Sequence, residues 1–316
     1  MHIGGRVMYV LDLIKRLVHK TNIPTLIYLV INVFVITGII ALLLIGFTGI
    51  TFWQEFVLAL ILYMISLFIA MSPFGEWILR LQTGCKKIKR AEQKEFIESI
   101  FQEVYEDAKK LDPHIPNKVK LYINGDSEPN AFATGRKTIC ITEGLLYMPQ
   151  DQIKATLGHE FGHLAHKDTD LILLVSVGNL IVSAFVLGFK LVIDIGHITT
   201  SIFAAILGGT EGVIMAICNA IYHFFITLFV TGIMWLWTKI GIWLVMKSSR
   251  SNEYEADEFS YRLGYGNALC AMLDSLGGST AKGLFASLES SHPDKDARIM
   301  HLQELGATYR VVYGAK

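Results

Sequence analysis

Apolar runs without a charged side chain alternate along this chain with stretches of mixed polarity. Four of these runs are long enough, at about 1.5 Å per helical residue, to cross a hydrocarbon layer of roughly 30 Å. They are Ile23–Phe47, Phe56–Gly75, Leu171–Phe189 and Gly212–Thr238, the last of which continues past Lys239 to Met246. The pattern therefore predicts four transmembrane helices.

The first run is expected to stay in the membrane and not to be cleaved off as part of a signal peptide. The apolar part of a signal peptide has about 7–15 residues and ends in small residues at the cleavage site. The run Ile23–Phe47 is longer than that and ends in the sequence LLIGF. We therefore count it as the first transmembrane helix.

Basic residues are distributed unevenly around the four runs. The links within the two predicted hairpins, Thr48–Glu55 and Val192–Glu211, contain no Lys or Arg. The segments before the first run and after the second and fourth runs carry Arg6, Lys15, Arg16, Lys20, Arg80, Lys86, Lys87, Lys89, Arg90, Lys247 and Arg250. By the positive-inside rule, both termini and the segments 76–170 and 247–316 are expected on the cytoplasmic side of the membrane.

The polar segments between and after the hairpins have the patterns of helices and strands. In chain order, the expected elements are a helix over Ala91–Lys110, a strand over Val119–Ile123, a hairpin turn at Gly135–Lys137, a strand over Thr138–Thr142 and a helix from Pro149 or Gln150 to Lys167. The last helix leads almost directly into the third apolar run. If it continues unbroken, its chemistry would lie close to the membrane surface.

These elements predict four consecutive parts of the chain. They are residues 1–75 with the first two transmembrane helices, 76–170 with the first half of a polar domain, 171–246 with a transmembrane hairpin and 247–316 with the second half of that domain. Neither half is large enough to bury a substantial core by itself. We expect the two halves to pack into one domain.

The composition narrows the class of protein. Hydrophobic residues make up 52% of the chain and charged residues 18%, against roughly 45–50% and about 25% in typical soluble domains. The 28 Lys and Arg residues balance the 28 Asp and Glu residues, so no basic field favours a nucleic-acid partner. The four cysteines form no C-x-x-C pair, which argues against a disulfide framework and a cysteine zinc site.

The candidate chemistry lies in the sequence HEFGH, residues 159–163. Two histidines four positions apart lie on one face of a helix, so His159 and His163 can both reach one metal ion. Glu160 falls on the adjacent flank, where its carboxylate can accept a proton from a water molecule activated by that metal. The alternative is a surface helix with two unrelated histidines.

A zinc hydrolase site needs a third protein ligand. His166 lies a further turn along the same face, too far to complete the site, and the metzincin pattern would require Gly and His at the positions of His166 and Thr169. Glu253 and Asp257 are four positions apart on a later helical segment, so Glu253 can bind the metal while Asp257 accepts a hydrogen bond from a ligand imidazole. Their spacing alone fits a charged solvent-facing surface equally well.

Four motifs occur in the same order as in the HtpX-type membrane zinc endopeptidases, bacterial relatives of the CAAX prenyl proteases. They are Pro129–Gly135 (PNAFATG), His159–His163 (HEFGH), Glu253–Asp257 (EYEAD) and Ser291–Pro293 with Arg298–Ile299. The two spans before the catalytic segment and the hairpin between the metal motifs also resemble this family. Two positions depart from its pattern: His166 replaces a commonly small polar residue, and Gly162 stands at a variable position.

The resemblance implies a mainly α membrane protein with four transmembrane helices and a cytoplasmic α+β zinc-metalloprotease domain that carries a small β-sheet. It implies one zinc ion per chain, held by His159, His163 and Glu253, with Glu160 as the catalytic base. It also places the protein in a bacterial inner membrane, with both termini and the active site in the cytoplasm.

The other two motifs acquire roles only through the resemblance. The first resembles a strand beside the active site to which an extended substrate could add, although an ordinary buried strand has the same pattern; it comprises Asn130, Ala131, Phe132, Ala133 and Thr134. In the last motif, His292 could stabilise the oxyanion and Arg298 could pair with Asp257 or another carboxylate. A histidine before proline in a loop is more often structural.

The function expected from these features is zinc-dependent cleavage of misfolded or damaged membrane proteins at the cytoplasmic face. The expected partners are membrane-protein or unfolded polypeptide substrates, the lipid bilayer and other membrane quality-control proteases, with no nucleic acid. A CAAX-type processing protease would use the same residues but have more spans. A transporter would carry more ionisable residues in its spans than His223 and Lys239, and a catalytically silent scaffold would be expected to lose a ligand.

Overall fold

The computed structural model describes residues 13–44, 49–275 and 295–310, with only the backbone described for residues 246–251. The chain forms two compact units. Unit 1 is assigned Met1–Thr25, Pro73–Leu173 and Leu244–Lys316, and unit 2 is assigned Leu26–Ser72 and Leu174–Trp243.

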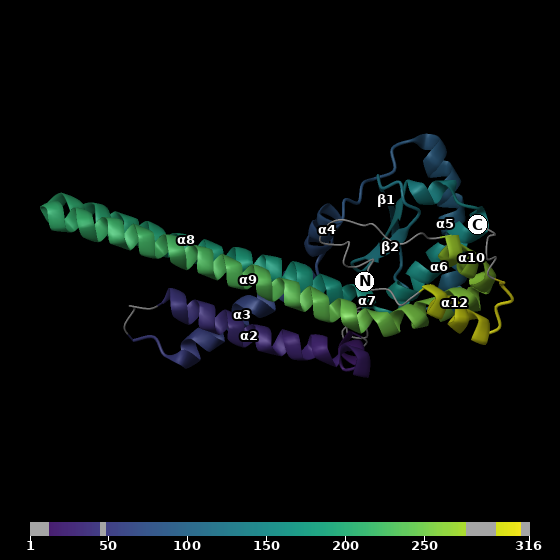
Figure 1. The fold of residues 1–316 in the computed structure, drawn as a ribbon, viewed down its shortest axis with the longest axis horizontal. Helices are drawn as coiled ribbons and strands as arrows, with labels where there is room; N and C mark the ends of the chain where they lie inside the picture. Colours follow the sequence, from purple (N-terminus) through teal and green to yellow (C-terminus); the bar gives the residue numbers. More distant parts are fainter. Residues whose placement is uncertain (1–12, 45–48, 276–294, 311–316) are drawn as a thin grey trace, which may run out of the picture. The chain divides into compact units, whose positions relative to one another are not determined.

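Unit 2 is built from long apolar helices (Figure 1). They are α2 (Ile23–Leu43), α3 (Phe52–Ala70), α8 (Gly178–Leu207) and the part of α9 (Gly209–Ser260) that precedes Leu244. The four segments long and apolar enough to span a membrane are Lys20–Leu43, Phe52–Ala70, Asp168–Leu207 and Gly209–Val245. The prediction of four transmembrane helices is confirmed, and the chain is an integral membrane protein.

The ends of the second span and the link between the third and fourth spans differ from the predicted pattern. The second span was predicted to extend to Gly75, but its helix ends at Ala70. A separate helix, α4, begins at Pro73, because the fixed φ angle of proline suits a first helical position. Most of the predicted link Val192–Glu211 is helical, and the chain reverses at Gly208 and Gly209. Gly209 has a φ angle of 57°, a left-handed conformation that favours glycine.

Polar side chains join three helices inside unit 2. Asn32 on α2 accepts a hydrogen bond from Trp237 Nε1 on α9 at 2.7 Å and donates one from Nδ2 to Asn179 Oδ1 on α8 at 2.8 Å. Tyr28 donates to the Trp237 carbonyl at 3.0 Å and stacks on its ring. Hydrogen bonds of this kind are a recognised contribution to helix association where lipid removes the hydrophobic driving force.

Unit 1 contains a small sheet and shorter helices. In chain order they are η1 (Lys20–Asn22), α4 (Pro73–Gln82), α5 (Ala91–Leu111), β1 (Lys120–Asn124), β2 (Ala131–Thr134), β3 (Thr138–Thr142), η2 (Gly144–Tyr147), α6 (Gln150–His166), α7 (Asp168–Ile172), the end of α9, η4 (Tyr261–Tyr265), α10 (Gly266–Ser275) and α12 (Lys295–Glu304). The π-helical turn η3 (Leu173–Val177) follows α7 and crosses the boundary between the units.

The three strands form a mixed sheet in the order β1-β3-β2, with β1 parallel and β2 antiparallel to β3. The antiparallel pair turns at Gly135, where a φ angle of 61° again favours glycine. Ile139 and Ile141 of the central strand are fully buried in the main core with residues of α5 and α6. Because β3 is the central strand, β2 lies at one edge of the sheet.

Helix α6 lies in the middle of unit 1 and is buried along most of its length. Phe161 packs against Phe101 and Tyr105 of α5, with ring centroids 5.4 Å and 5.7 Å away. On another side of α6, a Cβ atom at Gly162 would lie 2.9 Å from Ala256 Cα of α9. The sequence HEFGH is thus held between α5 and α9.

The helix does not continue unbroken into the third span, contrary to that expectation. It ends at His166, and Lys167 adopts a left-handed conformation with a φ angle of 62°. A new helical segment, α7, begins at Asp168. The helix is therefore interrupted four residues after His163.

Candidate metal centre

Two elements that are distant in sequence supply the candidate ligands. His159 and His163 lie on successive turns of α6, and Glu253 lies on the part of α9 that belongs to unit 1. All three are buried, with exposed fractions of 5%, 8% and 3%. A buried imidazole or carboxylate without a partner would be costly, so this grouping indicates a common function.

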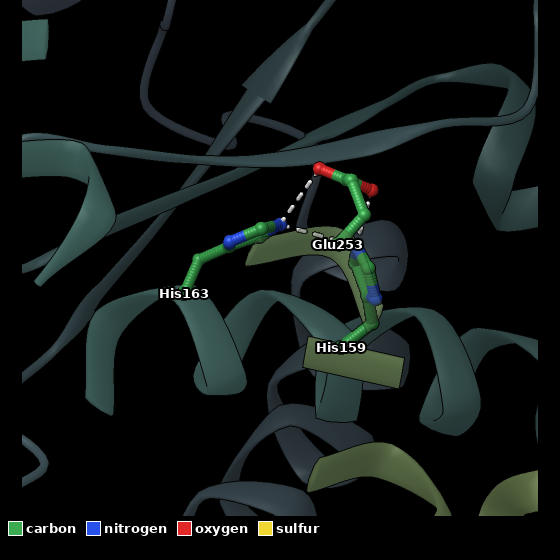
Figure 2. A group of neighbouring side chains, drawn as sticks. All are labelled: His159, His163 and Glu253. Atoms are coloured by element: carbon green, nitrogen blue, oxygen red, sulfur yellow. Dashed lines mark hydrogen bonds and ion pairs between the residues drawn. The ribbon is translucent and has the colours of Figure 1, made fainter. Parts of the chain in front are cut away.

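The three side chains converge on one point (Figure 2). His159 Nε2 lies 3.2 Å from His163 Nε2 and 3.4 Å from Glu253 Oε2, and His163 Nε2 lies 3.3 Å from Glu253 Oε1. Donors bound tetrahedrally at zinc's usual bond length of roughly 2.0–2.1 Å would be about 3.3 Å apart. The donor types and their separations therefore fit a zinc ion.

A carboxylate and a guanidinium stand behind the first histidine. His159 Nδ1 lies 2.9 Å from Asp257 Oδ1. Arg298 of α12 donates from Nε to Asp257 Oδ2 at 2.8 Å and from Nη2 to Oδ1 at 2.6 Å. Its Nη1 also lies 3.3 Å from Glu253 Oε2. Asp257 therefore links a ligand imidazole to a bidentate arginine, and its own exposed fraction is 0%.

A second set of the same kind stands behind the other histidine, and the sequence analysis missed it. His163 Nδ1 lies 3.0 Å from Asp168 Oδ2. Arg16 donates to Asp168 Oδ1 from Nε at 2.9 Å and from Nη2 at 2.5 Å. In the sequence, the only indication of this contact is a carboxylate five residues after His163. Whether the Asp168 side chain faces His163 depends on the left-handed conformation of Lys167. The sequence indicates for Arg16 only a contribution to membrane orientation, as one of the basic residues before the first span.

The carboxylates determine which imidazole nitrogen is available. An ionised carboxylate only accepts hydrogen bonds, so each Nδ1 carries the proton that it donates, and each Nε2 retains its lone pair for a metal. In the metal-free protein burial lowers the pKa of His159, but hydrogen bonds to Asp257 and Glu253 outweigh it and leave the pKa raised. Metal binding must therefore displace protons.

The same balance applies to the neighbouring groups. Burial opposes charging of His163, but the charge of Glu253 and the hydrogen bond to Asp168 hold its pKa well above the usual value. Burial likewise raises the pKa of Asp257, and Arg298 overcomes that effect and lowers it. The pKa of Arg298 is raised because Asp257 and Glu253 outweigh the effect of burial. Arg298 and Asp257 are therefore a charged pair inside the protein.

Glu160 lies beside the three candidate ligands without belonging to their group. Its side chain is buried, and its Oε2 accepts a hydrogen bond from the backbone N–H of Ala133 at 2.5 Å. Ala133 is on the edge strand β2. The carboxylate is therefore oriented by the strand and remains available to accept a proton.

The other predicted residues fall in different places. Ala131, Phe132, Ala133 and Thr134 form β2, and Asn130 directly precedes it. His166 lies outside the ligand group, with its Nδ1 3.8 Å from Glu255 Oε2. His292 lies outside the described residues.

Known proteins resemble the chain across this site. Residues 91–306 match peptidase family M48. The protease HtpX homolog of Tropheryma whipplei (strain Twist) is 29% identical over 216 residues, which cover 59% of this chain and 66% of that protein. The protease HtpX of Ectopseudomonas mendocina (strain ymp) is 28% identical over 271 residues, which cover 77% of this chain and 83% of that protein.

A solved structure is a more distant match. The crystal structure of S. mikatae Ste24p has a TM-score of 0.37 and 16% sequence identity, covering 95% of this chain and 66% of that one. The family match, by contrast, spans both the helix with His159 and His163 and the later helix with Glu253. The chain therefore belongs to peptidase family M48.

Proposed function

We propose that this protein is an integral-membrane endopeptidase that uses one zinc ion per chain. The observation that carries the proposal is the geometry of His159, His163 and Glu253. Their nearest atoms are 3.2–3.4 Å apart, with a different Glu253 oxygen facing each imidazole, and one ligand atom from each residue fits within 4.8 Å of the others. Glu160 lies beside this group and is oriented separately. Three ligands with an adjacent carboxylate are the parts required by a zinc peptidase.

The chemistry that zinc supplies at such a site is polarisation of the scissile carbonyl group and acidification of a water molecule. His159, His163 and Glu253 would hold the ion. The Glu160 carboxylate accepts the proton of the attacking water and passes it to the departing amine. The Ala133 N–H restrains this carboxylate at Oε2, which leaves Oε1 to receive the proton.

The edge strand β2 is the proposed substrate platform. Within the described part of the chain its backbone is paired with β3 on one side only, and an extended polypeptide can add to the other side of such a strand. Because Ala133 of this strand contacts Glu160, a peptide aligned along β2 would pass beside the proton acceptor. We assign Arg298 to positioning of Asp257, and we retain His292 as a proposed oxyanion-stabilising residue.

The proposed substrates are misfolded or damaged membrane proteins, cleaved at the cytoplasmic face of the membrane. His163 precedes the candidate span Asp168–Leu207 by only five residues. The basic segments around the spans favour a cytoplasmic location for residues 76–170 and 247–316. A site near the cytoplasmic surface would suit loops and loosened segments of membrane-embedded chains.

Replacement of Glu160 by Gln tests the catalytic proposal. Glutamine keeps the volume of the side chain but cannot accept the proton, so turnover of an unfolded or membrane-protein substrate should fall by about 10²–10⁴-fold. Bound zinc should remain near the wild-type amount, because Glu160 is not a proposed ligand. Both quantities are measured on the full chain in detergent, with substrate cleavage followed by gel and zinc by elemental analysis.

The matched control is Glu95→Gln, which removes an exposed carboxylate from α5 and should leave turnover unchanged. Chelation should abolish wild-type cleavage and zinc should restore it. Cleavage by Glu160→Gln at the wild-type rate would exclude the general-base role. A wild-type chain that binds zinc but cleaves nothing in a panel of loosely folded substrates would instead support a silent scaffold.

A further inference from the structure

We propose that Arg16, which precedes the first transmembrane helix, is a positioning residue of the metal centre. It acts through Asp168, which fixes the ring of the ligand His163. This inference rests on the proposed metal site and deepens it, because it makes the segment before the first span part of that site. All of the residues involved belong to unit 1.

Asp168 receives hydrogen bonds on both carboxylate oxygens. Oδ2 accepts the bond from His163 Nδ1 at 3.0 Å. Oδ1 accepts two bonds from the Arg16 guanidinium, at 2.9 Å and 2.5 Å, and one from Asn252 Nδ2 at 3.0 Å. With all of these donors in place, the carboxylate plane and the imidazole that it holds have a defined orientation.

Burial makes Asp168 dependent on the arginine. The Asp168 side chain is 6% exposed and that of Arg16 is 10% exposed. A buried carboxylate that loses its cation must find other hydrogen-bond partners or move toward solvent. Either change would weaken its hold on His163 Nδ1, and thus the basicity and orientation of Nε2.

Arg16 is itself held in place by unit 1. Its Nη1 lies 2.9 Å from Glu255 Oε2 on α9, two residues after the proposed ligand Glu253. Its carbonyl accepts a hydrogen bond from Asn22 Nδ2 at 3.0 Å, and Asn22 is fully buried. The Arg16 guanidinium is therefore held at Asp168 from the side of Glu255, and the Arg16 backbone is held by the buried Asn22.

The arrangement parallels the one behind the other histidine. Arg298 supports Asp257 and His159 from the C-terminal side of the chain, whereas Arg16 supports Asp168 and His163 from the N-terminal side. Each ligand imidazole thus has its own carboxylate and guanidinium. A role limited to anchoring the N-terminal segment would not require the guanidinium to bind the carboxylate that holds a ligand.

The test uses cobalt(II), whose visible absorption reports the ligand geometry without any catalytic turnover. Full-length protein in detergent is loaded with cobalt, and the spectrum and the affinity against a competing chelator are measured. Arg16→Gln should lower metal affinity by about 10–100-fold, as expected for loss of an outer partner of a ligand, and should shift the cobalt bands. Arg16→Lys, which keeps the charge without the fork, should recover part of the affinity.

Two controls separate a positioning role from a structural one. Lys15→Gln removes a neighbouring exposed cation and should leave both readouts unchanged. Asp168→Asn should reproduce the loss, and Arg16→Gln added to it should cause little further loss because the two residues act in one chain of contacts. The apparent melting temperature of each metal-free variant shows whether it is folded.

A wild-type spectrum and affinity for Arg16→Gln in a folded protein would overturn the inference while leaving the metal site intact. If Arg16→Gln lowers metal affinity by the same factor in the wild-type background and in the Asp168→Asn background, Arg16 does not act through Asp168. Failure of the wild-type chain to bind cobalt or zinc would instead contradict the proposed function. If Arg16→Gln does not fold, Arg16→Lys and Asp168→Asn provide the same comparison.

Discussion

At the scale of single residues, the proposed metal centre is a buried array of alternating charges. Asp257 and Asp168 each lie between a ligand imidazole and a guanidinium, at distances of 2.5–3.0 Å. Charges as buried as these are tolerated only when each has partners. Removing one member therefore affects the others, and the effect should depend on whether that member is a ligand or a support.

This distinction gives a prediction for the ligand set. Glu253→Ala should remove most of the bound zinc, because two imidazoles alone form an incomplete site. Asp257→Ala should weaken binding by about 10–100-fold, and His166→Ala should leave zinc bound. Zinc per chain is measured after dialysis against a weak chelator. Loss of zinc from His166→Ala with retention in Glu253→Ala would contradict the assignment.

At the scale of elements, the site depends on the close approach of α6 and α9. Glu253 and Asp257 reach the α6 histidines because Gly162 leaves room for the backbone of α9 at Ala256. A Cβ atom at Gly162 would lie 2.9 Å from Ala256 Cα and 3.0 Å from Phe259 Cβ. Neither contact is with the end of a flexible side chain, so the helices would have to separate.

Gly162→Ala should therefore lower both stability and metal affinity. Overpacking of this kind typically costs about 1–3 kcal/mol, and separation of the helices would move Glu253 away from the histidines. The measurements are the apparent melting temperature and the zinc affinity of the full chain. Gly125→Ala is the matched control, because a Cβ atom there meets nothing within 4 Å. Equal behaviour of the two variants would show that the interface can adapt.

At the scale of the whole molecule, unit 1 is assembled from three stretches of chain separated by membrane helices. Its first and last parts carry Arg16 and Arg298, which contact Asp168 and Asp257, and its middle part carries His159 and His163. All three stretches must therefore lie on the same side of the membrane. This requires an even number of spans between successive stretches. Two spans lie between the first and second stretches, and two lie between the second and third.

Topology reporters test this arrangement and its orientation. Reporters placed near Ile50 and after Gly208 should indicate the far side of the membrane, because the two links lack Lys and Arg. Reporters at residue 120 and at the C-terminus should indicate the cytoplasm. A far-side signal at residue 120 would reverse the orientation, and opposite signals at residue 120 and the C-terminus would contradict the assembly of unit 1.

The sequence by itself determined the features that depend on local periodicity. A charge-free run of about 20 residues is costly to leave in water and suited to the bilayer, so the four spans were readable, as were α5, β3 and α6 to within a residue. The spacing of His159 and His163 was sufficient to place both imidazoles on one helix face, because helix geometry is the same wherever the helix forms.

Only the tertiary structure decided which distant residues complete the site. Asp168 faces His163 across a break in the helix, where Lys167 adopts a left-handed conformation. A non-glycine residue adopts that conformation only where its surroundings favour it. Arg16 reaches Asp168 across a sequence separation of 152 residues, and Gly162 matters only because α9 lies against it. Such contacts follow from packing and charge pairing between segments, and no local pattern of polar and apolar residues encodes them.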